Sequence, residues 1–497
     1  MSKNPVVIAG AGPTGLMLAC ELRLAGVPVT LLEALSERTG QSRAGGIHAR
    51  TMEVLDQRGI LEGFLEQGKQ LAGGHFSAMW LDFSGFETRY PYLLQLLQAR
   101  IETLLEKRAA ELGVEVEWAS EVTGFEQDAD GIDITVRGPE GERVLRADYL
   151  VGCDGGRSTI RKAAGIGFSG TDASLVAYLC DAELDAPPSD RIFQQRTESG
   201  DFTVLGFEPG WYRLMVTRFD TDIDRDDTID FEEFRSIFTS IAGTDYGMRS
   251  PRWISRFTDA ARQADNYRAG RVLLAGDSAH IHFPAGGQGL NMGVQDAVNL
   301  GWKLAAVVKG EAPDNLLDSY EAERHPVTAR VLQNTRAQSA LNRPGPQVDA
   351  LREIFGDLIA QESVNSYLGT MINGLDIRYP MTGDHPLLGL RMPDLDLDTA
   401  DGSIRTYSLL HCGRAVLLDL TGDPTLADDL TGWQDRVDLV TATAEKRWTI
   451  PVLGEISAPA AVLIRPDGYV AWVSTGEAEN DRAALTSALH TWFGPAR

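Results

Sequence analysis

The stretch PVVIAGAGPTGLMLACELRLAGVPVTLLE, residues 5–33, predicts how the chain begins to fold. Its first five residues form an apolar run typical of a strand buried on both faces. The turn Gly10-Ala-Gly12-Pro13-Thr14-Gly15 follows, then a helix and a second strand that ends at Glu33. Such glycines let the backbone approach a pyrophosphate at the helix start, and an acid after the second strand can bind a ribose with a free 2′-hydroxyl. The stretch therefore predicts a Rossmann-like α/β unit that binds FAD or NAD.

A second stretch, GRVLLAGDSAHIHFPAGGQGLNMGVQDAVNLGWKLAAVV at residues 270–308, predicts another part of the same site. A short apolar strand ends at Gly276-Asp277, and open α/β sheets bind ligands at the carboxyl ends of their strands. The glycine-rich run from Pro284 to Asn291 leads into a helix, whose start stabilises negative charge. We expect this run to contact a flat ligand such as a reduced flavin ring, and Asp277 to accept a hydrogen bond from a polyol chain.

The composition excludes several classes of function. With 46 Lys and Arg against 71 Asp and Glu, the formal net charge is −25, which argues against nucleic acid and anionic membranes as partners. We expect a cytoplasmic protein, because no secretory leader and no apolar run of membrane-spanning length is evident. The four cysteines form no CxxC pair. His280 and His282 have the spacing of two metal ligands but lack accompanying ligands, and no GxSxG motif occurs, so we expect neither a metal site nor nucleophilic hydrolysis.

The hydrophobic pattern changes several times along the chain. Short alternating strands separated by Pro- and Asp-rich turns, including the acidic stretch at 220–230, indicate an inserted antiparallel sheet. Apolar strands return near the end of the chain. The predicted divisions are an FAD-binding domain at 1–174 and 268–343, a middle β-sheet domain at 175–267, a helical connector at 344–389 and a C-terminal unit at 390–497.

A third motif, CDGGRSTIRK at 153–162, again places small residues and an acid at a strand end. Together with the glycine turn and GRVLLAGDSAH at 270–280, it resembles the three signatures of single-component (group A) flavoprotein monooxygenases. Within that family the chain is most similar to the aromatic polyketide hydroxylases of antibiotic biosynthesis, and also to the rifampicin-inactivating branch. The resemblance covers essentially the whole chain. It implies an FAD-binding domain of the para-hydroxybenzoate hydroxylase type and a thioredoxin-like C-terminal domain, here without the CxxC that thiol redox chemistry needs.

The resemblance also assigns roles to individual positions. Arg43 lies in a glycine-flanked loop and would steady a mobile flavin, which is the one catalytic role that we assign; no side-chain base is identified. The positions implied to contact the cofactor are Gly10, Gly12, Pro13, Thr14, Gly15, Glu33, Ala34, Arg43, Gln98, Arg100, Val122, Asp154, Arg157, Asp277, Pro284, Gly287, Gly289, Leu290 and Asn291. Of these, Asp154 and Arg157 belong to a motif linked to both FAD and NAD(P)H.

The substrate would lie against the middle sheet and the aromatic segment at 71–95. Aromatic side chains there suit a flat ligand stacked above a flavin. The candidates for this wall are Phe76, Phe202, Phe207, Trp211 and Tyr212.

The resemblance implies hydroxylation of a polycyclic aromatic polyketide, with FAD as cofactor, NADPH or NADH as reductant, O2 as oxidant and a flavin C4a-hydroperoxide as the oxygen donor. Two alternatives use the same scaffold: inactivation of a rifampicin-type antibiotic, and Baeyer–Villiger oxygenation. A third belongs to another class, a flavin-binding protein without catalysis. We expect a monomer or a homodimer.

Overall fold

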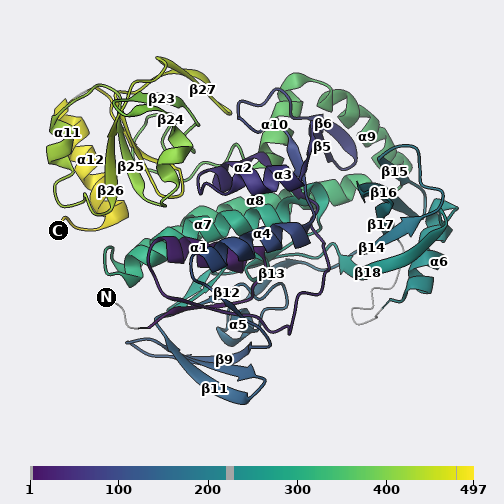
Figure 1. The fold of residues 1–497 in the computed structure, drawn as a ribbon. Helices are drawn as coiled ribbons and strands as arrows, with labels where there is room; N and C mark the ends of the chain where they lie inside the picture. Colours follow the sequence, from purple (N-terminus) through teal and green to yellow (C-terminus); the bar gives the residue numbers. More distant parts are fainter. Residues whose placement is uncertain (1–3, 220–228, 477) are drawn as a thin grey trace.

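The computed structural model describes residues 4–219, 229–476 and 478–497, and Figure 1 shows its fold. Most of the acidic stretch predicted at 220–230 lies outside these residues. A mixed α/β arrangement is present, as the sequence predicts: a central sheet with helices, an antiparallel sheet beside it, and a second α/β unit formed by the end of the chain (Figure 1). None of the helices in the described parts is both long and apolar enough to cross a membrane.

The central sheet is built from strands that lie far apart in the sequence. Its order is β20 (Arg268–Ala269), β21 (Val272–Leu274), β12 (Tyr149–Gly152), β1 (Val6–Ala9), β2 (Val29–Leu32) and β8 (Val116–Glu117). The neighbours from β21 to β8 pair in parallel, whereas β20 runs antiparallel to β21. β1 and β12 are buried at every position, because both faces of the sheet are covered. Parallel pairing brings the carboxyl ends of β1, β2, β12 and β21 to one edge.

Helices cover one face of this sheet, and a small sheet lies on the other side (Figure 1). The helices are α1 (Pro13–Leu24), α4 (Gln98–Glu111), α7 (Gln288–Val308) and α8 (Asp318–Asn342). The small sheet consists of β9 (Glu121–Gln127), β10 (Ile132–Gly138) and β11 (Gly141–Ala147), next to the short helix α5 (Thr159–Ala163). α7 is buried at every position from Asn291 to Ala305. It is therefore an internal helix, and its polar side chains must find partners inside the protein.

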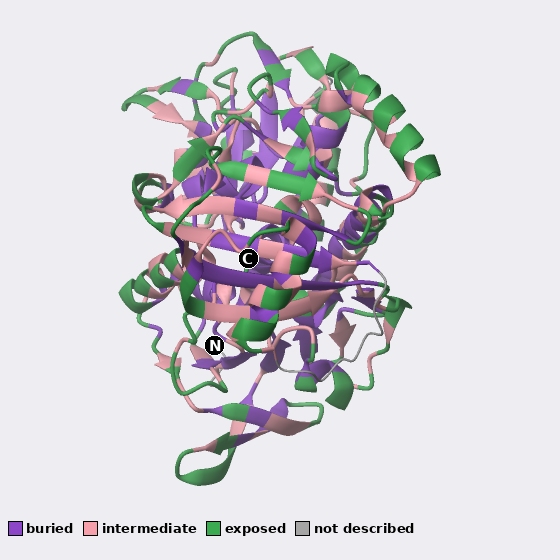
Figure 2. Ribbon diagram, turned by 90° about the vertical axis from the view of Figure 1, so that its right-hand side faces the viewer, coloured by how far each residue is buried: buried purple, intermediate pink, exposed green. Residues whose placement is uncertain are grey.

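An antiparallel sheet lies within the proposed 175–267 domain, and Figure 2 faces this side of the molecule. Its order is β15 (Ile192–Arg196), β16 (Gly200–Glu208), β17 (Trp211–Arg218), β14 (Val176–Leu184) and β18 (Met248–Thr258). Helix α6 (Phe231–Ala242) packs on one face, where Phe202, Leu214, Phe234 and Phe238 form an apolar core. The opposite face is free of α6.

Two helices lie within the proposed connector at 344–389. α9 (Pro346–Ile359) and α10 (Glu362–Asn373) pack on the hairpin of β5 (Gly73–Phe76) and β6 (Met79–Asp82) around Phe76, Phe83 and Ile359. Shorter elements of the first part of the chain are β3 (Gly46–Ile47), α2 (Ala49–Asp56), α3 (Leu61–Gln67), β4 (Lys69–Leu71), β7 (Leu93–Gln95), β13 (Phe168–Thr171), β19 (Ala261–Ala264) and β22 (His280–Ile281).

The C-terminal unit contains a four-stranded mixed sheet with the thioredoxin-like order β26-β25-β29-β30. Its strands are β25 (Ala415–Asp419), β26 (Val437–Thr441), β29 (Ala461–Ile464) and β30 (Val470–Val473), and α12 (Ala478–Phe493) follows. β25 pairs in parallel with β26 and antiparallel with β29. The remaining elements are β23 (Asp396–Thr399), β24 (Gly402–Arg405), α11 (Thr425–Asp429), β27 (Arg447–Ile450) and β28 (Gly454–Ser457).

Candidate active site

The glycine turn after β1 has the geometry of a pyrophosphate site. Gly10 has a φ of +107°, and a Cβ there would lie 2.3 Å from the carbonyl oxygen of Cys153. A Cβ on Gly15 would lie 1.9 Å from the carbonyl oxygen of Gly10, so α1 packs directly on the turn. At Gly12, by contrast, no described atom lies within 4 Å of the place of a Cβ. Because α1 starts at Pro13, after a glycine without a side chain to cap it, the open side of Gly12 and the first helical N–H groups suit an anion.

Glu33 lies beside this turn, as the sequence predicts. Its carboxylate accepts hydrogen bonds from the N–H of Ala11 (2.8 Å) and from the N–H two residues further on (3.0 Å). Ala34, which follows it, is exposed. The carbonyl of Glu33 accepts from the N–H of Ser120 (2.8 Å), two residues before the buried Val122 on β9. The assignment of Val122 to the adenine stays a prediction.

The structure brings the glycine turn and the second motif together. Asp277 is exposed in a short 3-10 turn, Gly276–Ser278, directly after β21. A Cβ on Gly276 would lie 2.6 Å from Oγ1 of Thr14, and one on Gly293 would lie 2.2 Å from the same atom. The start of α1, the turn before Asp277 and the first part of α7 therefore meet around Thr14, with Asp277 next to the glycine turn.

The acid of the third motif, Asp154, makes hydrogen bonds within the protein. The carboxylate of Asp154 accepts from the hydroxyl of Ser158 (2.5 Å) and from two backbone N–H groups at the start of α5 (2.7 and 3.1 Å). Arg161, rather than Arg157, connects this motif with the second one, because it donates to the carbonyl of Ser278 (2.8 Å). The resemblance places Arg161 in the same motif linked to FAD and NAD(P)H, and in the structure it is the largest buried side chain of that motif.

Three of the predicted cofactor cations, Arg43, Arg100 and Arg157, are exposed. A guanidinium nitrogen of Arg43 lies 3.5 Å from the side-chain oxygen of Gln41, and one of Arg100 lies 3.9 Å from Glu208. Their assignment to FAD or NAD(P)H stays a prediction.

Two side chains hold the loop that carries Arg43. The side-chain oxygen of Gln98, at the start of α4, accepts from the N–H of Ala44 (3.1 Å). At the other end of the loop, the buried Asn291 accepts from the N–H of His48 (2.9 Å). Gln98 also donates to the carboxylate of Glu102 (2.8 Å), and the assignment of Gln98 and Asn291 to the cofactor stays a prediction.

The predicted flavin-ring end of the site lies at the start of α7. Gly287 precedes this helix with a φ of +67°, a backbone conformation that favours glycine. The imidazole of His48 lies 3.7 Å from the place of a Cβ on Gly287. Burial lowers the pKa of His48 to about 4, so this ring is neutral at pH 7. Sequence reasoning missed His48, although it directly follows the Arg43 loop. The other predicted residues of this end are Pro284, Gly289, Leu290 and Asn291.

The free face of the middle sheet holds some of the predicted substrate residues and not others. Phe207 is on this face, where its ring lies 2.7 Å from the place of a Cβ on Gly45 in the Arg43 loop. Phe202 is on the opposite face, fully buried against Phe238 of α6, and Tyr212 packs in the same core. These two residues are covered because α6 packs on their side of the sheet.

The remaining two substrate candidates are also occupied by contacts within the protein. Phe76 is buried against Phe355, with ring centroids 5.5 Å apart, so it is part of the core under α9. Trp211 is half-buried, and the guanidinium of Arg252 lies 3.6 Å from its ring centroid. We keep Phe207 and Trp211 as candidates for the wall.

A charged cluster on the free face was missed by sequence reasoning. The buried Arg213 donates to both carboxylate oxygens of Asp181 (2.8 and 2.9 Å) and to the carbonyl of Arg43 (3.2 Å). Its guanidinium carbon lies 4.8 Å from the ring centroid of Phe207 and 5.2 Å from that of Trp253. The cluster therefore connects the free face of the sheet to the Arg43 loop. The position of Arg213 between the apolar residues of WYRLMV, residues 211–216, was the available signal.

A cavity of about 300 Å³ borders the start of α7. Gln288 and Asn291 line one side of it, and parts of α8 and residues 371–378 line the rest. Asn291 joins this cavity to the predicted ring end of the site. The glycine turn does not line it.

The two histidines considered as metal ligands have other partners. Nε2 of the fully buried His280 lies 2.7 Å from Oδ2 of Asp296, and Nδ1 of His282 lies 2.7 Å from the carbonyl oxygen of Phe283. The described residues contain no group of three or more His, Cys, Asp or Glu side chains that could hold a metal ion.

Comparison with known proteins identifies the family. Residues 3–335 match the family described as FAD binding domain, and residues 385–496 match the family described as aromatic-ring hydroxylase, C-terminal. The chain belongs to the FAD-dependent aromatic-ring hydroxylases.

Relatives of this hydroxylase match it over nearly their full length. It is 49% identical to anhydrotetracycline monooxygenase of Streptomyces rimosus and 45% identical to rifampicin monooxygenase of Streptomyces venezuelae, with 99% of each chain covered in both cases. Its structure resembles that of OxyS anhydrotetracycline hydroxylase from Streptomyces rimosus, with a TM-score of 0.92 and 50% identity over 99% of this chain and 100% of that one. The hydroxylase is therefore a flavoprotein monooxygenase with FAD as its cofactor, and NAD(P)H and O2 are the usual co-substrates of its family.

Proposed function

We propose that this hydroxylase adds one oxygen atom to a polycyclic aromatic polyketide in antibiotic biosynthesis, with NADPH or NADH as reductant. The observation that carries the proposal is the meeting of the free face of the middle sheet with the Arg43 loop. The half-buried rings of Phe207 and Trp253 lie there, with the guanidinium of the buried Arg213 near both, next to the elements that would hold the flavin. A relative named for anhydrotetracycline, a molecule with fused rings, supports the same class of substrate.

The residues present fit FAD. The open side of Gly12 and the start of α1 would receive its pyrophosphate, Glu33 its adenosine ribose, and Asp277 the ribityl chain. The start of α7 would lie at the ring, where the helix dipole favours negative charge. When bound, FAD supplies the acceptance of hydride from the nicotinamide and the activation of O2 for transfer to an electron-rich ring.

The protein's own residues bind and orient the substrate and the flavin, and they exclude water from the reacting ring. Phe207 and Trp253 would contact the face of a flat substrate, and the apolar surroundings keep water from the reacting ring. Arg43 would steady the flavin from its exposed loop, whose backbone Arg213, Gln98 and Asn291 already hold in place. No side-chain base is needed for this role. We further propose that the protein is cytoplasmic and acts as a monomer or homodimer.

A second candidate is inactivation of a rifampicin-type antibiotic, which the relative at 45% identity favours. Baeyer–Villiger insertion is chemically compatible with the same site. The test is turnover of the purified holoprotein with NADPH under ¹⁸O2, against a panel of tetracyclic, angular and ansamycin compounds, followed by mass spectrometry.

We expect a tetracyclic or angular compound to stimulate NADPH oxidation and to give a product with one added ¹⁸O on an intact ring system. Oxygenation of ansamycins only would favour the resistance role, and fragmentation that reveals an expanded or cleaved ring would favour Baeyer–Villiger chemistry. FAD retention without an oxygenated product from any compound, under conditions in which the anhydrotetracycline relative turns over, would refute the proposal.

A further inference from the structure

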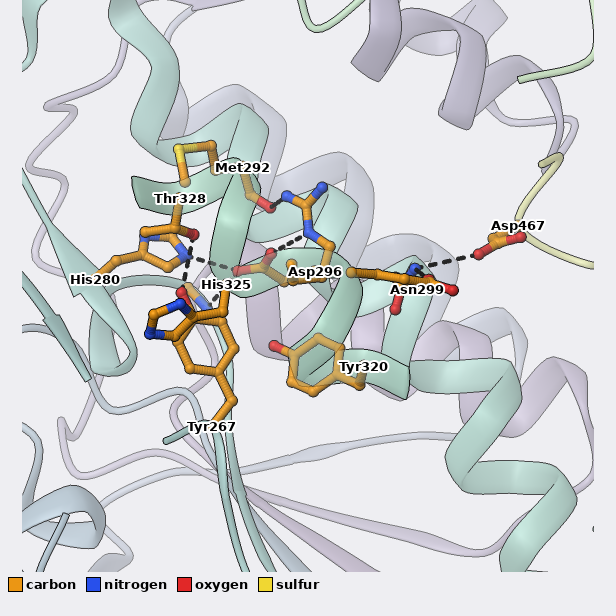
Figure 3. Close-up of polar contacts among 12 residues, drawn as sticks. Tyr267, His280, Met292, Asp296, Asn299, Tyr320, His325, Thr328 and Asp467 are labelled. Atoms are coloured by element: carbon orange, nitrogen blue, oxygen red, sulfur yellow. Dashed lines mark hydrogen bonds and ion pairs between the residues drawn. The ribbon is translucent and has the colours of Figure 1, made fainter. Parts of the chain in front are cut away.

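Asp296 on α7 fixes the turn that carries Asp277. The Asp296 side chain is completely buried, and its carboxylate accepts from the N–H of Gly276 (3.1 Å) and from Nε of Arg324 (2.7 Å). Figure 3 shows His280 and Asp296 facing each other in the same cluster. Burial raises the pKa of Asp296, but Arg324 and His280 outweigh this effect and hold it below its ordinary value, so the carboxylate is charged. Because Gly276 immediately precedes Asp277, any shift of Asp296 moves the predicted ribityl contact.

Arg324 connects this carboxylate with the C-terminal unit. It lies on α8 and is fully buried, and it also donates to the hydroxyl of Tyr379 (3.1 Å). The ring of Tyr379 stacks on that of Tyr469, with centroids 4.1 Å apart and planes inclined by 30°. Tyr469 belongs to the loop between β29 and β30. A continuous series of direct contacts therefore runs from this loop through Tyr379, Arg324 and Asp296 to the N–H of Gly276.

A second set of contacts joins the same loop to Glu323, the residue before Arg324 on α8. Arg465 donates to both carboxylate oxygens of Glu323 (2.6 and 2.9 Å), and Lys303 donates to one of them (2.8 Å). Asp467 accepts from the side chain of Asn299 (3.3 Å), which Figure 3 shows one turn beyond Asp296 on α7. The charged side chains are 0–2% exposed.

This cluster is electrically balanced and specific in geometry. Two cations, Lys303 and Arg465, face two anions, Glu323 and Asp467. Such a buried cluster is stable only while every member has its partner, since an unpaired charge in a water-free site is strongly unfavourable. It holds α7 and α8 at one fixed relative position, and that position sets the distance from Arg324 to Asp296.

We propose that residues 465–469 of the C-terminal unit are a positioning element for the FAD site. They do not touch the site. They contact Tyr379 and α8, and Arg324 of α8 pairs with Asp296. Asp296 in turn fixes the backbone of the Gly276-Asp277 turn. The C-terminal unit thereby contributes to retention of the cofactor, through contacts that require no thiol chemistry.

The test compares two variants with a matched control in the full-length holoprotein. Tyr379→Phe removes only the hydroxyl that accepts a hydrogen bond from Arg324, and Arg465→Met removes the cation of the ion pair with Glu323. The control is Arg414→Met, which breaks an ion pair with Asp438 inside the C-terminal unit, where the two side chains are 34% and 45% exposed. FAD release on dilution is followed by the rise in flavin fluorescence, and the visible circular dichroism of bound FAD and the unfolding temperature are measured alongside.

We expect FAD to be released about tenfold faster from Tyr379→Phe and faster still from Arg465→Met, with an altered flavin dichroism, because supporting contacts behind a ligand typically carry effects of this size. Arg465→Lys should restore part of the retention, and Arg414→Met should behave as wild type. If Arg465→Met does not fold, Tyr379→Phe decides the question. Folded Tyr379→Phe with wild-type release and dichroism would overturn the proposal, as would equal effects in the Arg414→Met control.

Discussion

Exchange of Gly12 or Gly15 in the first turn for alanine should affect two different quantities, the affinity for FAD and the stability of the fold. Gly15→Ala places a methyl group 1.9 Å from the backbone carbonyl oxygen of Gly10, whereas Gly12→Ala places one in open space. The backbone at Gly12, with φ −72° and ψ −178°, is accessible to alanine without strain. The two substitutions are chemically identical and only three residues apart, so each serves as the control for the other.

The magnitudes follow from the two environments. At Gly15 the turn or α1 must move by more than an ångström; overpacking costs about 1–3 kcal/mol, and the better helix propensity of alanine returns about 1 kcal/mol. Since the obstructing atom is backbone, we expect the upper end, a net loss of about 2 kcal/mol in the free energy of unfolding. At Gly12 the apoprotein should gain about 0.4–1 kcal/mol from the less flexible unfolded chain. A methyl group at the closest approach of a pyrophosphate should weaken FAD binding by about 1–3 kcal/mol, roughly one to two orders of magnitude in Kd.

Urea unfolding of the apoproteins, followed by tryptophan fluorescence, measures the first effect, and titration with FAD measures the second. Gly12→Ala should unfold at or above the wild-type urea midpoint and bind FAD poorly. If it binds FAD as tightly as wild type, the pyrophosphate does not approach the open side of Gly12 and our placement of the cofactor is refuted. Wild-type stability of Gly15→Ala would show that the turn is looser than the distances indicate.

Four further outcomes are expected. Asp277→Ala should lose FAD faster on dilution while the apoprotein keeps its unfolding temperature, since the side chain is exposed; unchanged retention would remove Asp277 from the site. Arg43→Ala should slow flavin reduction by NADPH or raise peroxide release, and stopped-flow absorbance with a peroxide assay would detect either change. Cys412→Ser should leave turnover and coupling near wild type, because the C-terminal unit has no second cysteine; a large loss of turnover with FAD content intact would contradict this. Burial raises the pKa of Asp201 to about 6. The unfolded carboxyl loses its proton near pH 3.9, about 2 units lower. The stabilisation from this group is therefore complete below about pH 4 and lost as the pH rises through about 6, and Asp201→Asn should abolish that slope in urea midpoints measured against pH.

The cofactor half of the site could be predicted from the sequence because its signals are local. The spacing of Gly10, Gly12 and Gly15 between an apolar strand and a helix specifies both the turn and its ligand. Glu33 and Asp277 each end a buried strand, and parallel pairing brings such ends to one edge of the sheet.

The substrate half could not be predicted in the same way. Phe202 and Phe207 are five residues apart on β16 and both alternate with smaller residues, but the side on which α6 packs decides which is covered. Arg213 becomes a candidate for the site only once Asp181, 32 residues away, lies opposite it and the Arg43 loop lies against it. Asp154 accepts hydrogen bonds from the start of α5, a local use that the motif did not predict, and its assignment to the cofactor stays a prediction.

The central sheet has a consequence for the order of events during synthesis. β1 pairs with β12 through Val6 and Tyr149, and β12 pairs with β21 through Leu150 and Val272, so these pairings close loops of well over a hundred residues. Contacts of such long sequence separation form slowly, and chains are made at about 5–20 residues per second. The glycine turn leaves the ribosome early, but the turn before Asp277 joins it only after more than half of the chain has emerged. A nascent chain therefore has only half of the nucleotide site until synthesis passes the middle of the chain, and FAD can contribute to its stability only after that point.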